Sequence, residues 1–300
     1  MLGPTLTLPA FAKINLSLLV LGKRPDGYHE LDTVLQTISL HDTIKLTVTD
    51  GPEIVLSCDD RSLPTGADNL VYLAAESLQT RFAPDKGVRI RLEKRIPLQA
   101  GLGGGSSDAA STLIGLCRLY RVSRKANQAK LHRLASGLGS DVPFFLLESP
   151  LAAATGRGEK LKPLAVRGKM PGVVIVYPGR PAYTKEAFGR LRLAPEAGIK
   201  SRLAGFRKIV RDIADGHFTP ERAGLFNRLE ETVLPLHREV RLAKDRLQRA
   251  GAGAALMSGS GSAVFALVRE PGQARRIAAA IKCNRSYKVF FSILCVYYVY

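Results

Sequence analysis

Three observations predict an α+β protein of two domains. The chain has 300 residues, 46% of them hydrophobic, which is enough for a large core and long for a single domain. Alternating apolar and polar residues indicate strands in both halves of the chain, and apolar residues at helical spacing indicate helices between them. We place the domain boundary near residue 160, so that the expected domains span 1–160 and 161–282 and leave a hydrophobic tail at 283–300.

The first predicted strand puts two polar side chains on one face. Lys13 and Asn15 alternate there with apolar residues, and successive residues of a strand point to opposite faces. The two side chains therefore point the same way. A lone strand lysine usually faces solvent, but a polar pair on one face suggests the wall of a site. A turn at 24–27 and extended segments at 33–40 and 43–48 follow.

A glycine-rich run separates a predicted strand from a predicted helix. Residues 68–82 carry a helical pattern, and a half-buried strand at 88–93 then leads into the glycines of 101–105. Apolar residues at helical spacing return over 109–120. They predict a second helix, capped by one of the two serines or the aspartate at 106–108.

This order of strand, glycine run and helix favours phosphate binding. Glycines leave backbone N–H groups uncovered, and the start of the following helix adds its positive end. The run is not a GxxxxGK[ST] loop, because Ser106 and not a lysine precedes Ser107, and Ser106 also replaces the third glycine of GxGxxG. The alternative is a flexible linker or a structural turn, although four glycines and two serines at a helix start are hard to explain by packing.

Two further turns carry residues suited to a site. Pro143 disfavours a helical conformation at the residue before it, so Asp141 is expected at a turn between a helix and a strand, where it can face a cleft. An aspartate in a turn is more often a cap or a surface charge. Further on, a strand at 173–177 and helical patterns at 220–250 precede a second glycine loop at 257–262.

Charge and cysteine content narrow the class of partner and the compartment. With 44 basic and 26 acidic residues the net charge is +18, which attracts nucleotides, phosphorylated metabolites, nucleic acid or acidic lipid. The four cysteines are scattered without a CxxC pair, which argues against a zinc site or a disulfide framework and fits a reducing cytoplasm. Because no signal-peptide pattern and no stretch of about 18 uninterrupted apolar residues is present, we expect a soluble protein without membrane contact.

Five segments together resemble the GHMP kinases, the superfamily of galactokinase, homoserine kinase and mevalonate kinase. In chain order these segments are 12–16, 24–31, 97–110, 139–145 and 258–262. The third resembles the ATP-binding signature of the superfamily, and the first two resemble one branch, the kinases of diphosphocytidyl-methylerythritol in non-mevalonate isoprenoid synthesis. The resemblance implies a two-domain GHMP fold, with an N-terminal domain of the ribosomal-protein-S5-like type and a ferredoxin-like C-terminal domain.

The resemblance also implies an ATP- and Mg²⁺-dependent kinase with specific residue roles. Asp141 would take the proton from the substrate hydroxyl, and Lys13 would steady the developing charge and orient Asp141. Asn15 would contact the substrate, and Ser107 is the hydroxyl candidate for the magnesium ion or its waters. ATP would be held by Leu98, Gln99, Ala100, Gly101, Leu102, Gly103, Gly104, Gly105, Ser106, Ser107 and Asp108.

For the acceptor, the family pattern implies a stacked cytosine. Tyr28 and Phe188 would sandwich the base, His29 would bond to its edge, and Thr184 lies close in sequence as a further contact. Without the resemblance, Phe188 would be interpreted as a buried aromatic residue, and His29 as a turn histidine whose hydrogen bonds are made locally. The implied partner is CDP-methylerythritol, with no nucleic acid and no membrane, bound by a monomer or weak homodimer.

Two other functions stay open at this stage. The first is another GHMP kinase, acting on mevalonate, homoserine or a sugar, although residues 26–30 favour the nucleotide-linked acceptor. The second is a nucleic-acid-binding protein, which the Arg-rich region 200–249 would suit, but a solvated helix face explains those charges more simply. The tail at 283–300 does not align with the family. We expect it to complete a sheet edge or to form an exposed, aggregation-prone segment.

Overall fold

The structure is a computed structural model that describes residues 2–147, 149–165, 171–192, 196–219, 224–282 and 287–295, with backbone alone for 2 and 196–201. In chain order, its elements are β1 (Leu2–Lys23), β2 (His29–Cys58), α1 (Leu70–Phe82), β3 (Lys86–Glu93), α2 (Gly104–Leu119), α3 (Gln128–Leu138), α4 (Val142–Leu146), β4 (Leu151–Gly156), β5 (Lys160–Pro163), β6 (Gly172–Tyr177), α5 (Thr184–Gly189), α6 (Glu196–Ala214), β7 (Phe226–Asn227), α7 (Glu230–Leu236), α8 (Arg238–Arg249), β8 (Ala254–Met257), β9 (Val264–Val268), α9 (Pro271–Lys282) and β10 (Lys288–Ile293).

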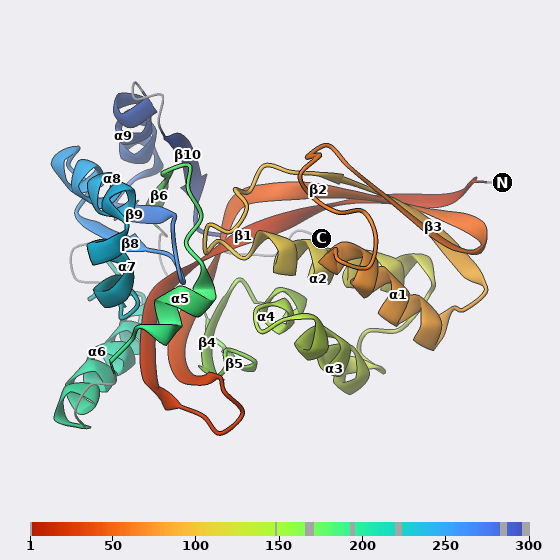
Figure 1. Cartoon of the computed structure of the whole chain (residues 1–300), viewed down its shortest axis with the longest axis horizontal. Helices are drawn as coiled ribbons and strands as arrows, with labels where there is room; N and C mark the ends of the chain where they lie inside the picture. Colours follow the sequence, from red (N-terminus) through yellow and green to blue (C-terminus); the bar gives the residue numbers. More distant parts are fainter. Residues whose placement is uncertain are drawn as a thin grey trace.

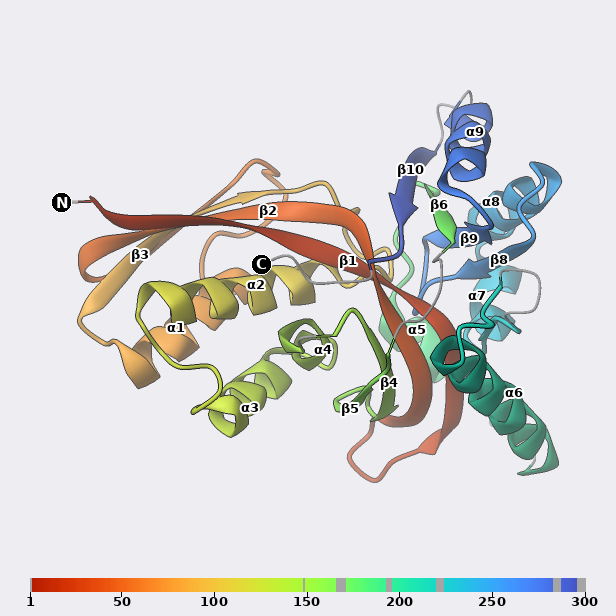
Figure 2. The same cartoon turned by 180° about the vertical axis from the view of Figure 1, so that it is seen from behind.

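Two sheets organise the described part of the chain. The larger has strand order β5-β4-β2-β1-β7, with β3 also paired to β2, and the smaller has order β10-β6-β9-β8. The long strands β1 and β2 run the length of the larger sheet, and helices α1 to α4 lie along one face of it (Figure 1). Helices α8 and α9 lie on the side of the smaller sheet that faces away from the larger one (Figure 2).

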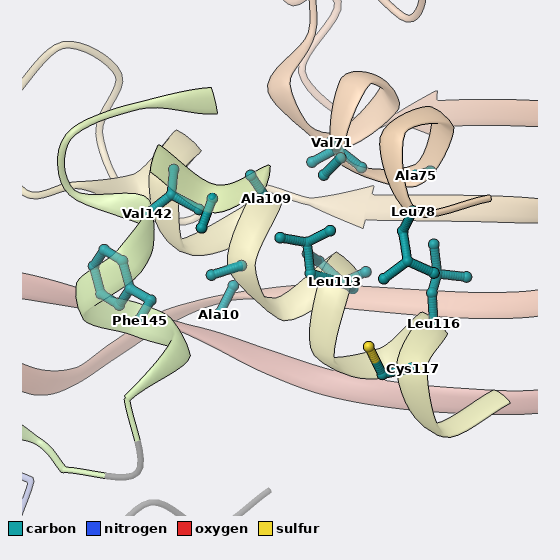
Figure 3. Packing of buried hydrophobic residues seen from close by; sticks show 14 of the residues in the cluster. Ala10, Val71, Ala75, Leu78, Ala109, Leu113, Leu116, Cys117, Val142 and Phe145 are labelled. Carbon is teal, nitrogen blue, oxygen red and sulfur yellow. The ribbon is translucent and has the colours of Figure 1, made fainter. Parts of the chain in front are cut away.

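Three hydrophobic clusters hold these layers together. One lies between the larger sheet and α1 to α4, one between the two sheets and α6, and one between the smaller sheet and α7 to α9. Figure 3 shows the first cluster, in which Leu113 and Leu116 of α2 meet Leu78 of α1, while Phe145 of α4 closes one end. Because α2 is packed by buried residues from its second turn onward, its exposed start is held in a fixed position.

Most predicted elements are confirmed, and two local expectations are wrong. The helix after the glycine run begins at Gly104 and is capped by Gly103, not by a serine or Asp108, because Gly103 adopts φ +71° in the left-handed region and the following glycines already continue as helix. Asp141 precedes the short helix α4 and not a strand, since Pro143 sits in the first turn of that helix, where its missing N–H costs no bond.

The tail forms part of the fold over its described residues. Strand β10 pairs antiparallel with β6 at the edge of the smaller sheet, in agreement with the first of the two alternatives for this segment. It also reaches the larger sheet, because the Ser292 hydroxyl lies 3.1 Å from that of Ser39 and the Cys295 N–H donates to the Thr37 carbonyl at 3.0 Å. Residues 283–286 and 296–300 lie outside the described residues.

Candidate active site

Three polar side chains form what we call the transfer centre: Lys13, Asn15 and Asp141. The Lys13 ammonium donates to Asn15 Oδ1 at 2.7 Å and lies 3.3 Å from Asp141 Oδ2. Lys13 and Asn15 are neighbours on one face of β1, as their spacing predicts, and both are buried. The side chain of Asp141 is 33% exposed against 4% for Lys13. The centre therefore presents one accessible carboxylate, backed by a buried cation.

A chain of hydrogen bonds fixes the orientation of this centre. Asn15 Nδ2 donates to Thr33 Oγ1 at 2.8 Å, and the Thr33 hydroxyl donates to the Ser17 carbonyl at 2.6 Å. With its amide oxygen and nitrogen both engaged, Asn15 holds the Lys13 ammonium in one place. Thr33 is a residue that sequence reasoning missed, since a threonine in a strand pattern carries no signal beyond strand propensity.

The first glycine loop runs directly against the centre. The Lys13 N–H donates to the Leu102 carbonyl at 2.9 Å, and a Cβ at Gly103 would stand 3.0 Å from Lys13 Cγ. Gly103 caps α2 without a side-chain hydrogen bond, and the first N–H groups of a helix have no partner within it. The start of α2 thus offers backbone donors next to Lys13, as a phosphate site requires.

The second glycine loop, between β8 and β9, closes the other side of the centre. The Ser258 hydroxyl donates to the Gly101 carbonyl at 2.9 Å, which ties the two glycine loops together. A Cβ at Gly259 would stand 3.3 Å from both Lys13 Nζ and Asn15 Oδ1. Asn227 holds this loop in place, because its side-chain amide donates to the Met257 and Gly259 carbonyls at 2.8 and 2.7 Å.

Ser107 was predicted as a metal contact, and its surroundings fit that role in part. Its hydroxyl is buried in α2 and has no hydrogen-bond partner among the described residues. No group of three or more His, Cys, Asp or Glu side chains there is arranged to hold a metal ion. Magnesium in kinases usually keeps several waters and binds mainly the phosphates of the nucleotide, so a full protein cage is not needed.

Asp108 was predicted to contact ATP, and the structure places it in a buried charge network below the loop. The Lys94 ammonium lies 2.7 Å from Asp108 and also bonds to Asp42. Asp42 in turn accepts from the backbone N–H groups of Arg95 and Ile96, just before the loop. Burial, together with the charge of Asp42, outweighs the attraction of Lys94 and raises the pKa of Asp108 to about 8. The network joins the two ends of the glycine loop.

The predicted base-binding residues gather in what we call the acceptor corner: Tyr28, His29 and Phe188. The rings of His29 and Phe188 lie with centroids 5.0 Å apart, although 158 residues of sequence separate them. Tyr28 is 52% exposed, and the guanidinium of Arg157 lies 4.6 Å from the centroid of its ring. Burial and the charge of Lys23 lower the pKa of His29, so its imidazole is neutral at neutral pH.

The structure connects the acceptor corner to the second glycine loop through one contact. The Thr184 hydroxyl, at the start of α5, lies 2.8 Å from the Ser260 hydroxyl. Since α5 also carries Phe188, this bond ties the ring to the loop beside Lys13. The stacking of a base between Tyr28 and Phe188 stays a prediction, as does the Thr184 contact with substrate.

Among the described residues, no helix is both long enough and apolar enough to cross a membrane.

Comparison with known proteins identifies the family. The model of the GHMP kinases N terminal domain matches residues 69–149, and that of the GHMP kinases C terminal domain matches 203–287. The 4-diphosphocytidyl-2-C-methyl-D-erythritol kinase of Pelotomaculum thermopropionicum is 42% identical over 274 residues, covering 91% of this chain and 93% of that protein. The kinase of the same name from Bacillus subtilis is 40% identical, covering 93% and 94%.

Solved structures agree with the sequence comparison. A crystal structure of 4-(cytidine 5'-diphospho)-2C-methyl-D-erythritol kinase superimposes with a TM-score of 0.77 at 37% identity, covering 96% of this chain and 99% of that one. Homoserine kinase from Cytophaga hutchinsonii has a TM-score of 0.75 at 18% identity, over 97% of this chain and 95% of that one, and so shares the fold. Both predicted GHMP domains are matched, and the chain belongs to the GHMP kinase family, in the branch of the 4-diphosphocytidyl-2-C-methyl-D-erythritol kinases.

Proposed function

We propose that this chain is an ATP-dependent kinase that phosphorylates the 2-hydroxyl of 4-diphosphocytidyl-2-C-methyl-D-erythritol. The observation that carries the proposal is the transfer centre, an accessible Asp141 carboxylate 3.3 Å from a buried Lys13 ammonium between two glycine loops. Phosphoryl transfer asks a protein to position two reactants and to offset charge on the moving group. The relatives named for this reaction, with about 40% identity over most of their length, support the choice of acceptor.

In this proposal Asp141 acts as the general base. Its carboxylate accepts the proton of the acceptor hydroxyl as that oxygen forms a bond to the γ-phosphorus of ATP, and the bond from that phosphorus to the ADP oxygen breaks. Lys13 holds Asp141 in position and offsets negative charge that builds up during transfer. Asn15 fixes the Lys13 ammonium through its 2.7 Å bond and contacts the acceptor.

The glycine loop, residues 98–108, holds ATP in this proposal. The N–H groups at the start of α2, which receive no side-chain hydrogen bond from the Gly103 cap, and the positive end of that helix would bind its phosphates. Mg²⁺, when bound, would neutralise phosphate charge, with Ser107 as the protein group nearest to that role because its hydroxyl is otherwise unpartnered. Asp108 supports the loop from below.

The test is an acceptor panel. Purified protein is incubated with Mg-ATP and, in separate reactions, CDP-methylerythritol, mevalonate or homoserine, and ADP release is followed. The proposal expects turnover with CDP-methylerythritol and at least about 100-fold lower kcat/KM with the other two, because neither offers a base to the acceptor corner. Comparable turnover of mevalonate or homoserine would assign the chain to a different GHMP activity.

A further inference from the structure

Building on the proposed function, we infer that Arg157 is a specificity residue that binds the diphosphate of the acceptor, between the transfer centre and the acceptor corner. Arg157 lies on the turn between β4 and β5, and its guanidinium sits 4.6 Å from the centroid of the Tyr28 ring. A guanidinium recognises phosphate oxygens through paired N–H donors and at the same time stacks on an aromatic face.

The turn holds Arg157 in a fixed backbone geometry. Gly156 and Gly158 flank it with φ +73° and +110°, and a Cβ at Gly156 would stand 2.8 Å from the Glu159 carboxylate oxygens. That carboxylate accepts the backbone N–H of Arg157 at 2.6 Å, and Glu30 accepts the N–H of Gly156 at 3.1 Å. Glycines are therefore required on both sides, and they place the one long side chain between them.

The same turn spans the distance between the two parts of the site. At one end, the Arg157 side chain covers the ring of Tyr28 in the acceptor corner. At the other end, a Cβ at Gly158 would stand 4.0 Å from the carbonyl oxygen of Ser140, the residue before Asp141. An acceptor that stacks its base at Tyr28 and presents its hydroxyl to Asp141 must carry its diphosphate past this turn. A negatively charged group leaving water there needs a cation or N–H donors.

Two other cations near the site are already engaged. Arg24 pairs with Asp26 and Glu30 at 3.1 and 2.6 Å, and Lys13 serves the transfer centre. No carboxylate among the described residues lies within salt-bridge distance of the Arg157 guanidinium. The charge of Arg157 acts at longer range on Asp26. Partial desolvation raises the pKa of Asp26, but the Tyr28 N–H, Arg24 and Arg157 together hold it below its ordinary value. Arg157 thus places a cation without a salt-bridge partner among the described residues on the turn that the diphosphate must pass.

The experiment compares two ligands that differ only in phosphate. Dissociation constants of cytidine and CDP are measured by calorimetry for the wild type, Arg157→Met, Arg157→Lys and the control Arg190→Met. Arg190 has the same charge, lies at the end of the helix that carries Phe188, and is 58% exposed in a pair with Glu186. Thermal melts confirm that each variant is folded.

The inference predicts that Arg157→Met weakens CDP binding by at least about tenfold and cytidine binding by less than about threefold, since only CDP carries the phosphates that the guanidinium binds through charge-assisted hydrogen bonds. Arg157→Lys should retain part of the preference for CDP over cytidine, and Arg190→Met should retain all of it. Equal losses for both ligands, or no loss for CDP, would overturn the inference and leave the proposed function standing. If the wild type binds neither ligand, the proposed acceptor is wrong, and so is the inference that rests on it.

Discussion

The transfer centre and the acceptor corner are built in opposite ways. Lys13 and Asn15 are buried, joined by a 2.7 Å bond and backed by Thr33, so their geometry is set by the fold. Tyr28 is half exposed, and its ring is contacted by the Arg157 guanidinium, an interaction with less directional preference than a hydrogen bond. In the proposed function, the buried part of the transfer centre thus lies on β1, its exposed carboxylate lies just before α4, and recognition lies on turns and a short helix.

This difference suggests that the transfer centre and the acceptor corner have separate functions. A preorganised centre lowers the barrier to transfer because its donors need not reorganise, and a more open corner can close around the base of the acceptor. Changes in the centre should then lower kcat, and changes in the corner should raise the KM of the acceptor.

The largest expected effect belongs to Asp141→Asn. The amide keeps the shape of the side chain but cannot take a proton, so kcat should fall at least about 100-fold while the dissociation constant of the acceptor changes little. Steady-state ADP release and calorimetry with CDP-methylerythritol measure the two quantities. A variant that keeps more than about a tenth of the wild-type kcat would exclude Asp141 as the base.

A smaller effect is expected for Gly103→Ala. Its φ of +71° disfavours any side chain, and the new Cβ would press on Lys13 Cγ and on Phe145 Cζ at 3.0 and 3.1 Å. We expect kcat/KM for ATP to fall about tenfold or more, through displacement of Lys13 and of the loop. Gly137→Ala is the matched control, since a Cβ there, in α3, meets nothing within 4 Å. Similar kinetics for the two variants would mean that the loop tolerates side chains.

The network beneath the loop predicts a pH effect on stability. The pKa of Asp108 is about 8 in the folded protein and near 4 when unfolded, so the folded state binds the extra proton between these values. The contribution of this group to the free energy of unfolding therefore falls as pH rises from about 4 to 8. Asp108→Asn removes this dependence. In urea unfolding, the free energy of unfolding of the variant should rise relative to that of the wild type from pH 5 to pH 8. A difference between the two proteins that does not change with pH would contradict the assigned pKa.

The regular parts of the fold could be predicted from the sequence because their periodicity is local. The helix 70–82 and the strand 86–93 match predicted segments, since apolar residues alone define their buried faces. The cap of α2 could not be predicted, because a left-handed Gly103 depends on the close approach of Lys13. The tail was ambiguous in sequence, and its pairing with β6 follows from an open sheet edge more than 100 residues away.

For the site, the sequence indicated which residue types take part but not all of their partners. Lys13 and Asn15 were found from their spacing, and Asp141 from its turn and the family motif. Asp42 and Lys94 were missed, because a buried charge network forms between segments 52 residues apart and leaves no local pattern. Arg157 was missed for the same reason, since its partner Tyr28 lies on another strand connection.

The separation of chemistry from recognition is tested most directly by the kinetics of Tyr28→Ala. With CDP-methylerythritol and saturating Mg-ATP, we expect the acceptor KM to rise about tenfold or more, because base–aromatic stacking is worth about 1–3 kcal/mol. The kcat at saturating acceptor should stay within about threefold of the wild type, since neither the Lys13–Asn15 hydrogen bond nor the Lys13–Asp141 ion pair involves Tyr28. An unchanged KM, or a kcat that falls as far as in Asp141→Asn, would contradict the account.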